Sequence, residues 1–138
     1  MPAATATIVA LDVGDKRVGV AIASRAAGLP NPLITLERGP EFMTSLQNLL
    51  KSNFVTAIVV GLPRNLSGQE TSQTKQTRQF IGELGQIIDL PIYWQDEAAT
   101  TLAAENELRG RGQPYQKADI DALAASYILE DYLMSNEG

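Results

Sequence analysis

The stretch TIVALDVGDKRVGVAIA, residues 7–23, predicts a β-hairpin at the start of the chain. Residues 7–13 and 17–23 are both apolar and rich in β-branched side chains, which pack well on a pleated surface. Residues 14–16, Gly-Asp-Lys, have the small and polar character of a tight turn. We therefore expect the chain to begin with two antiparallel strands.

Later in the chain, apolar runs predict further strands and apolar stripes with helical spacing predict helices. Further strands are predicted at 33–36, 55–60 and 90–95, and helices at 40–52, 70–88, 98–108 and 119–133. The early strands form a meander, whereas the later strands alternate with helices. This order predicts an α/β fold in which a mixed five-stranded sheet, with its first three strands antiparallel, carries helices on both faces. Residues 1–138 are expected to form one domain.

The composition excludes several classes of chemistry. The 138 residues include no cysteine and no histidine, so disulfides, zinc–thiolate sites and a Ser-His-Asp triad are excluded. A catalytic metal would need oxygen ligands, which favours Mg²⁺ or Mn²⁺. The net charge of −5 argues against nonspecific wrapping of nucleic acid but allows a local basic rim. We find no signal peptide and no apolar membrane span, and expect a cytoplasmic protein.

Asp12 stands in an otherwise apolar strand. It shares one face of that strand with Ile8 and Ala10. A buried charge at this position costs several kcal/mol, on the order of the buried-ion penalty, unless a metal ion or an arginine balances it. The alternative is a strand-end aspartate that caps the following turn, and this residue alone does not decide between the two.

Asp121 raises the same question on the last predicted helix. It lies on an apolar stripe with Ala124, Ala125 and Ile128, so it should face the sheet. The simpler interpretation is a favourable negative charge in the first helical turn. Asp119 suits that role better, as the expected N-cap.

Asp96 and Glu97 follow the strand at 90–95 and precede a helix, a junction where α/β folds bind ligands. One of the two can cap the helix while the other points into a site. Three carboxylates at one sheet edge would repel each other without a cation, and with one they form an oxygen-ligated metal site.

Four segments resemble, in order, the motifs of the YqgF-type family, whose members are RNase H-like nucleases also described as Holliday-junction-resolvase-like. The segments are LDVGDKRVGVA (11–21), IVVGLPRN (58–65) followed by Ser67 and Gly68, DEAATT (96–101), and IDALAA (120–125). The resemblance covers nearly the whole chain. It implies an RNase H-like fold, with Asp12, Glu97 and Asp121 as the catalytic acids that hold the metal. One position departs from the family, which usually has arginine where this chain has Ala98.

The same resemblance implies hydrolysis of phosphodiester bonds in the 5′-end maturation of pre-16S ribosomal RNA. Nucleic acid, and with it ribosomal precursor particles, would be the partner. The substrate contacts would come from basic and polar residues near the acids: Lys16, Arg17, Arg64, Asn65, Thr100 and Thr101. Arg17 would neutralise a phosphate, or pair with Asp12 when no metal is bound. A loop with Arg109, Arg111 and Lys117 would either clamp the substrate or be a solvated loop.

Three alternatives stay open from the sequence. A DNA endonuclease that resolves four-way junctions would use the same acids. A non-catalytic RNA-binding factor in ribosome assembly would bind RNA without them. The segment 12–21 also resembles the phosphate loop of actin-like ATPases and sugar kinases, although a single domain of 138 residues lacks their second half. The sequence does not distinguish RNA from DNA as the substrate, one bound metal ion from two, or a monomer from a homodimer.

Overall fold

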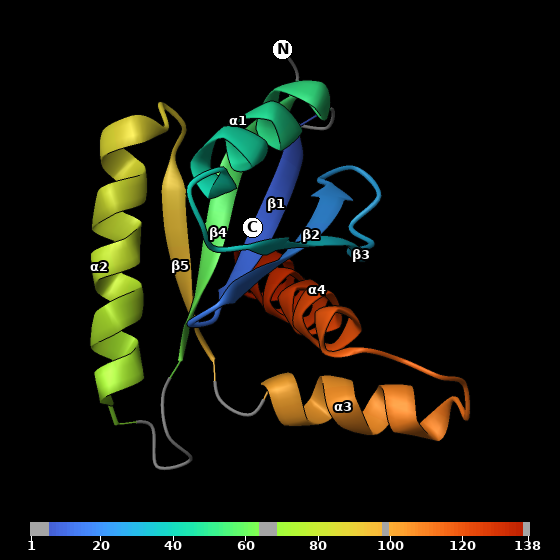
Figure 1. Ribbon diagram of the computed structural model, residues 1–138. Helices are drawn as coiled ribbons and strands as arrows, with labels where there is room; N and C mark the ends of the chain where they lie inside the picture. The colour runs from blue at the N-terminus through green and yellow to red at the C-terminus, as the bar shows by residue number, and fades with distance from the viewer. Residues whose placement is uncertain (1–5, 64–68, 98–99, 137–138) are drawn as a thin grey trace.

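The computed structural model describes the backbone of residues 6–63, 69–97 and 100–136 (Figure 1). Its strands are β1 Thr7–Val13, β2 Arg17–Ser24, β3 Asn31–Glu37, β4 Val55–Pro63 and β5 Ile92–Glu97. Its helices are α1 Phe42–Ser52, α2 Ser72–Ile87, α3 Thr100–Gly110 and α4 Lys117–Asn136. This is the predicted order of elements.

The predicted hairpin is confirmed. β1 and β2 pair antiparallel from Thr7 opposite Ser24 to Val13 opposite Val18. The turn closes where the Gly14 amide donates to the Arg17 carbonyl at 2.8 Å. A Cβ atom on residue 14 would lie 2.9 Å from that carbonyl oxygen, so glycine suits this tight turn.

The five strands form one mixed sheet in the order β3-β2-β1-β4-β5. β2 pairs antiparallel with β1 and β3, whereas β4 lies parallel to β1 and β5 parallel to β4. Figure 1 shows α1 and α2 on one side of the sheet and α4 on the other. The carboxyl ends of β1, β4 and β5 therefore meet at one edge, as expected for parallel strands.

The alternation of side chains along β1 divides the core between the two faces. Val9, Leu11 and Val13 pack in a cluster with residues of α1 and α2. Ile8 and Ala10 pack in a second cluster with residues of α4. Because Asp12 has the same parity as Ile8 and Ala10, it belongs to the face that α4 covers. The predicted placement of Asp12 is thus confirmed.

α3 packs on α4 rather than on the sheet. A small separate cluster joins Ala104 and Leu108 of α3 to Leu123 and Ala124 of α4. The Tyr127 hydroxyl of α4 also donates to the Glu107 carboxylate of α3. α3 therefore lies against α4, which itself packs on the sheet (Figure 1).

The predicted start of the last helix is wrong by two residues. α4 begins at Lys117, so Asp119 is not the N-cap but lies in the first turn. Its carboxylate accepts a hydrogen bond from the backbone N–H of Gln116, the residue before the helix, at 2.8 Å. In a capping box the acid in the first turn makes this contact with the N-cap residue. The sequence pattern located the acid correctly but assigned it the wrong cap position.

β3 and β4 are longer than predicted. β3 runs from Asn31 to Glu37 because its edge pairing with β2 continues past the apolar core of the segment. β4 continues through Gly61 to Pro63 because β5 pairs with it along that length. No helix in the described part of the chain is long and apolar enough to cross a membrane.

Candidate functional site

The end of β1 and the start of α4 meet at Asp12 and Asp121, because Gly19 allows a close approach. Gly19 of β2 pairs with Asp12 across the hairpin. A Cβ atom on Gly19 would lie 2.8 Å from the Ala122 nitrogen and closer still to the main-chain carbonyl of Asp121. Only a glycine lets α4 lie this close to β2. The two predicted acids, 109 positions apart in the chain, are thereby brought together.

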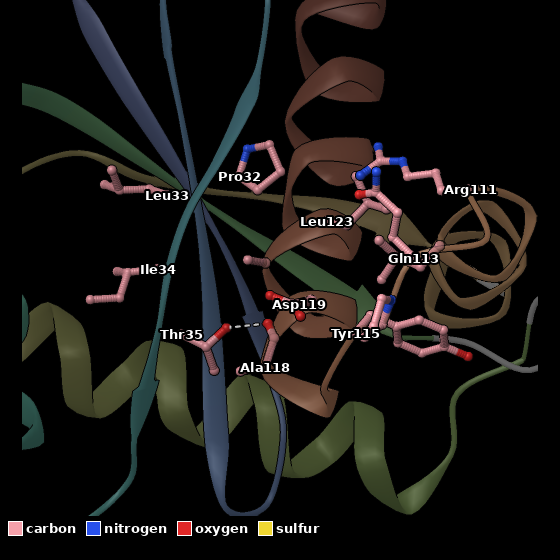
Figure 2. A pocket seen from close by; sticks show the side chains of 13 residues that line it. Pro32, Leu33, Ile34, Thr35, Arg111, Gln113, Tyr115, Ala118, Asp119 and Leu123 are labelled. Atoms are coloured by element: carbon pink, nitrogen blue, oxygen red, sulfur yellow. Dashed lines mark hydrogen bonds between the residues drawn. The ribbon is translucent and has the colours of Figure 1, made fainter.

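A hydrogen bond fixes the same region of α4 to the edge strand. The Thr35 hydroxyl of β3 donates to the Ala118 carbonyl at 2.7 Å, as Figure 2 shows. Ala118 lies in the first turn of α4 and Asp121 lies one turn later. The start of α4 is therefore held by β3 through Thr35 and approaches β2 at Gly19.

Asp12 and Asp121 lie in one site, where it is unfavourable for both carboxylates to be charged at once. Burial, and secondarily the charge of Asp121, raise the pKa of Asp12 to about 7. The negative charge of Asp121 is instead balanced by Arg17, because Asp121 Oδ2 accepts a hydrogen bond from Arg17 Nε at 2.7 Å. The side chains of Arg17 and Asp121 are 33% and 20% exposed, so water reaches this ion pair. Arg17 thus pairs with Asp121 and not, as predicted, with Asp12.

The backbone of Glu97 lies at the same edge of the sheet. It is the last residue of β5 and pairs with Pro63, the last residue of β4. Its side chain lies outside the described part of the chain, as does all of Ala98. Among the side chains that the structure describes, no group of three acids is positioned to hold a metal. The described acids of the candidate site are therefore Asp12 and Asp121.

The other predicted contact residues divide into two groups. Lys16 is exposed in the hairpin turn, beside Arg17. Arg64 and Asn65 lie outside the described residues, and Thr100 and Thr101 begin α3 with side chains that are not described. Of the six predicted contact residues, only Lys16 and Arg17 therefore have described side chains, and the basic rim stays a prediction.

Arg109, in the last turn of α3, and Arg111, just after that helix, are paired with neighbouring acids. Arg109 pairs with Glu105 at 2.7 Å and Arg111 pairs with Glu107, both one helical turn apart. A cavity of about 390 Å³ lies beside them, between β3 and the start of α4 (Figure 2). Arg111, Tyr115 and Asp119 line it, but neither Asp12 nor Asp121 does. The cavity and the candidate acidic site are therefore separate features.

Sequence reasoning missed two residues that build the site. Gly19 lies inside the strand predicted at 17–23, and a glycine within a strand pattern is a signal of close backbone approach. Arg38, just after β3, donates from its guanidinium to the Gly14 carbonyl at 2.9 Å. It steadies the turn that follows Asp12, and no local pattern indicated that contact.

A mixed five-stranded sheet in this order, with helices on both faces, has the RNase H-like fold. Two solved structures share the fold. They are a T. thermophilus RuvC in complex with a Holliday junction substrate, with a TM-score of 0.55, 13% identity and 96% of each chain covered, and a Fowlpox virus resolvase with its junction DNA, with a TM-score of 0.52, 12% identity and 94% and 97% covered.

Residues 6–135 match the RuvX family, described as Holliday junction resolvase, and the chain belongs to this family. A relative from Roseiflexus sp. (strain RS-1) is 40% identical over 132 residues, covering 93% of this chain and 94% of its own. A relative from Rickettsia africae (strain ESF-5) is 38% identical over 134 residues, covering 94% and 87%. Both carry the name "Putative pre-16S rRNA nuclease". The resemblance on which the sequence interpretation depended is confirmed.

The raised pKa of Asp12 predicts an unusual pH dependence of stability in the metal-free protein. Between pH 3.8 and about 7 the folded protein keeps the Asp12 proton that the unfolded chain has released. Stability that depends on Asp12 should therefore fall as pH rises through this window, by at most about 1.4 kcal/mol per pH unit, and level off above it. Urea unfolding in EDTA, compared between the native protein and Asp12→Asn, isolates this contribution. Parallel pH curves for the two proteins would contradict it.

Proposed function

We propose that this chain is a metal-dependent nuclease that hydrolyses a phosphodiester bond in the 5′-end maturation of pre-16S ribosomal RNA. The observation that carries the proposal is the juxtaposition of Asp12 and Asp121, where burial and the second carboxylate raise the pKa of the first to about 7. Membership of the RuvX family and the names of its relatives support this reading. The role places the protein in the cytoplasm, with ribosomal precursor particles as its partner.

The residues fit a hard divalent cation. Two carboxylates in a partly buried site repel each other, and a cation between them would remove the cost that raises the pKa of Asp12. Carboxylate oxygens are preferred by Mg²⁺ and Mn²⁺, and the chain has no histidine or cysteine that would favour zinc. We propose that Asp12, Asp121 and Glu97 hold this ion. When bound, it would stabilise the negative charge that develops on phosphate oxygens during hydrolysis.

The protein's own groups would then orient the substrate. Arg17 balances Asp121 in the structure described here, and a cation on the carboxylates would free its guanidinium for a phosphate. Lys16, exposed in the same turn, would add a second backbone contact. We propose Arg64, Asn65, Thr100 and Thr101 as further contacts, from the segment that follows Pro63 and from the start of α3. Basic groups at the rim of an acidic centre allow nucleic acid to approach despite a net charge of −5.

Cleavage of a DNA four-way junction is the second candidate, because the family description and both structural relatives concern Holliday junctions. The test incubates the purified protein with a precursor RNA that carries the unprocessed 5′ end of 16S rRNA, and separately with a four-way junction. Each reaction contains Mg²⁺, Mn²⁺ or EDTA. We expect cutting of the RNA with either metal and none in EDTA. Cutting of the junction alone would support the second candidate, and cutting of neither with any metal would contradict both.

A further inference from the structure

The only tryptophan of the chain, Trp94, is exposed at the edge of the sheet. It lies on β5, which pairs with β4 on one side and is the last strand of the sheet. Its exposed fraction is 49%, high for a large aromatic residue within a strand. The guanidinium carbon of Arg78, on α2, lies 5.6 Å from the centre of its ring. The indole therefore has a cation over one face and a large area open to solvent.

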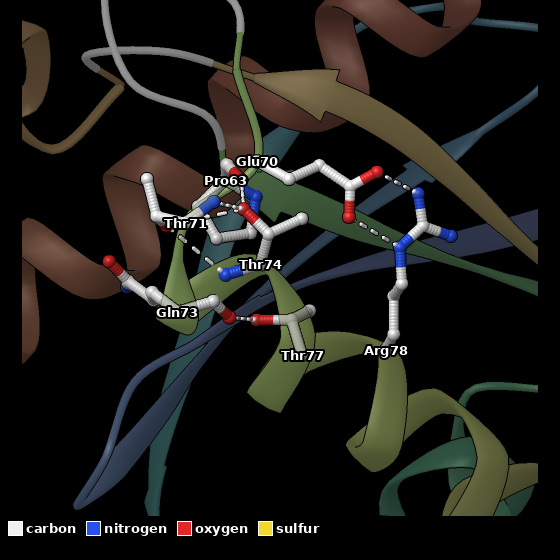
Figure 3. Close-up of polar contacts among 7 residues, drawn as sticks. All are labelled: Pro63, Glu70, Thr71, Gln73, Thr74, Thr77 and Arg78. Atoms are coloured by element: carbon white, nitrogen blue, oxygen red, sulfur yellow. Dashed lines mark hydrogen bonds and ion pairs between the residues drawn. The ribbon is translucent and has the colours of Figure 1, made fainter.

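Arg78 is held in place by a bidentate contact with Glu70. Its Nε donates to Glu70 Oε1 at 3.1 Å and its Nη2 donates to Glu70 Oε2 at 3.2 Å, as Figure 3 shows. Two parallel hydrogen bonds orient the planar guanidinium, so its position over the ring is defined before any ligand binds. Lys75 is exposed one turn earlier on the same face of α2 and adds a positive charge.

The beginning of α2 is also tied to the end of β4, beside the candidate site. The Thr71 side chain accepts from the Thr74 backbone N–H, and the Thr74 hydroxyl returns a contact to the backbone N–H of Thr71. The Thr74 hydroxyl also contacts the carbonyl of Pro63, the last residue of β4 (Figure 3). The helix that carries Arg78 is therefore anchored to the sheet edge where Glu97 ends β5.

Trp94 lies close to that edge along the chain. It precedes Glu97 by three residues of the same strand, which corresponds to roughly 10 Å at the usual rise. Because Arg78 contacts it from α2, the indole lies on the sheet face opposite to Asp12. β5 is the last strand of the sheet, so a nucleic acid strand from the acidic site would reach the indole by crossing this edge strand. An exposed aromatic ring with an arginine beside it is the arrangement by which proteins bind unpaired bases without reading their sequence.

We propose that Trp94 and Arg78 form a stacking platform for an unpaired nucleobase of single-stranded RNA that crosses the edge strand β5. This inference rests on the proposed function, because it assigns the platform to the same substrate. It further implies that the protein binds single-stranded RNA more tightly than the same sequence in a duplex, since a base within a duplex is already stacked on its neighbours.

The test measures binding in EDTA, so that it does not depend on cleavage. The probes are a labelled single-stranded RNA of about 12 nucleotides and the same sequence as a duplex. We expect the single strand to quench the fluorescence of Trp94, which is the only tryptophan and so reports directly on stacking. Affinity, from fluorescence anisotropy of the RNA, should fall about tenfold in Trp94→Leu and be largely retained in Trp94→Phe, which keeps a ring.

Phe54→Ala is the matched control. Phe54 is 83% exposed but precedes β4, at the end of that strand opposite the candidate site, so its loss should leave RNA affinity unchanged. Unchanged fluorescence at saturating RNA, no binding of single-stranded RNA, or equal affinity of Trp94→Leu and the native protein would each overturn the platform. So would an equal loss in Trp94→Phe. RNA binding with these properties but without any cutting in Mg²⁺ or Mn²⁺ would instead overturn the nuclease proposal alone.

Discussion

Asp12→Asn is expected to lower the rate of metal-dependent RNA cutting at least about a hundredfold while leaving the protein folded. The change removes a charged ligand from the proposed metal site, and loss of groups that merely orient a ligand already costs about 10- to 100-fold. At pH 8 without metal the variant should be more stable than the native protein, because it no longer ionises an aspartate whose pKa is raised to about 7. Single-turnover cleavage and urea unfolding measure the two effects.

Asp89→Asn serves as the control for that experiment. Asp89 is exposed between α2 and β5, at the end of the sheet away from the candidate site, so the same chemical change there should alter neither rate nor stability by much. Cutting by Asp12→Asn at the native rate would refute the assignment of Asp12. Reduced cutting with reduced stability at pH 8 would instead show that Asp12 is a structural group.

Gly19→Ala is expected to cost about 3 kcal/mol or more of stability, at or above the upper end of ordinary overpacking. The added methyl group would overlap the Asp121 carbonyl and lie 2.8 Å from the Ala122 nitrogen. These are main-chain atoms, which cannot rotate away as a flexible side chain does. α4 would have to move outward, and cutting should fall as well because Asp121 moves with it. Denaturant unfolding followed by circular dichroism measures the first effect.

Gly82→Ala makes the same chemical change where there is space. Gly82 lies on the exposed side of α2, and a Cβ atom there meets nothing within 4 Å. Because glycine disfavours a helix interior, this variant should gain about 0.5–1 kcal/mol of stability. If Gly19→Ala unfolds at the same denaturant concentration as the native protein, the close approach of α4 to β2 does not constrain the fold.

The positions of Asp12 and Asp121 could be predicted because local periodicity decides them. A period of two places Asp12 on the face of Ile8 and Ala10, and a helical period places Asp121 on the apolar stripe of its helix. Both faces were assigned correctly, since each element buries one side against the other. The pairing of Arg17 with Asp121 was not predicted, because the two are 104 residues apart and no local pattern joins them.

The choice between Asp96 and Glu97 shows where physical reasoning from sequence ends. Both acids lie at the end of a strand, and either would suit a helix N-terminus, so only the family resemblance favoured Glu97. The structure ends β5 at Glu97, which brings its backbone to the correct edge, and the role of its side chain stays a prediction. The contact of Arg78 with Trp94 lay equally beyond the sequence, because it joins a helix to a strand 16 residues later.

In the described part of the chain α3 packs mainly on α4, and this has a thermodynamic consequence. Its apolar contacts form a cluster of their own, so α3 can unfold locally without exposing either cluster that packs on the sheet. The free energy of that local opening is necessarily smaller than that of global unfolding, and backbone amides of α3 should exchange with solvent before those of β1 and β4. α3 therefore belongs to a layer that can open before the sheet does, whereas Asp12 lies on a strand at the centre of the sheet.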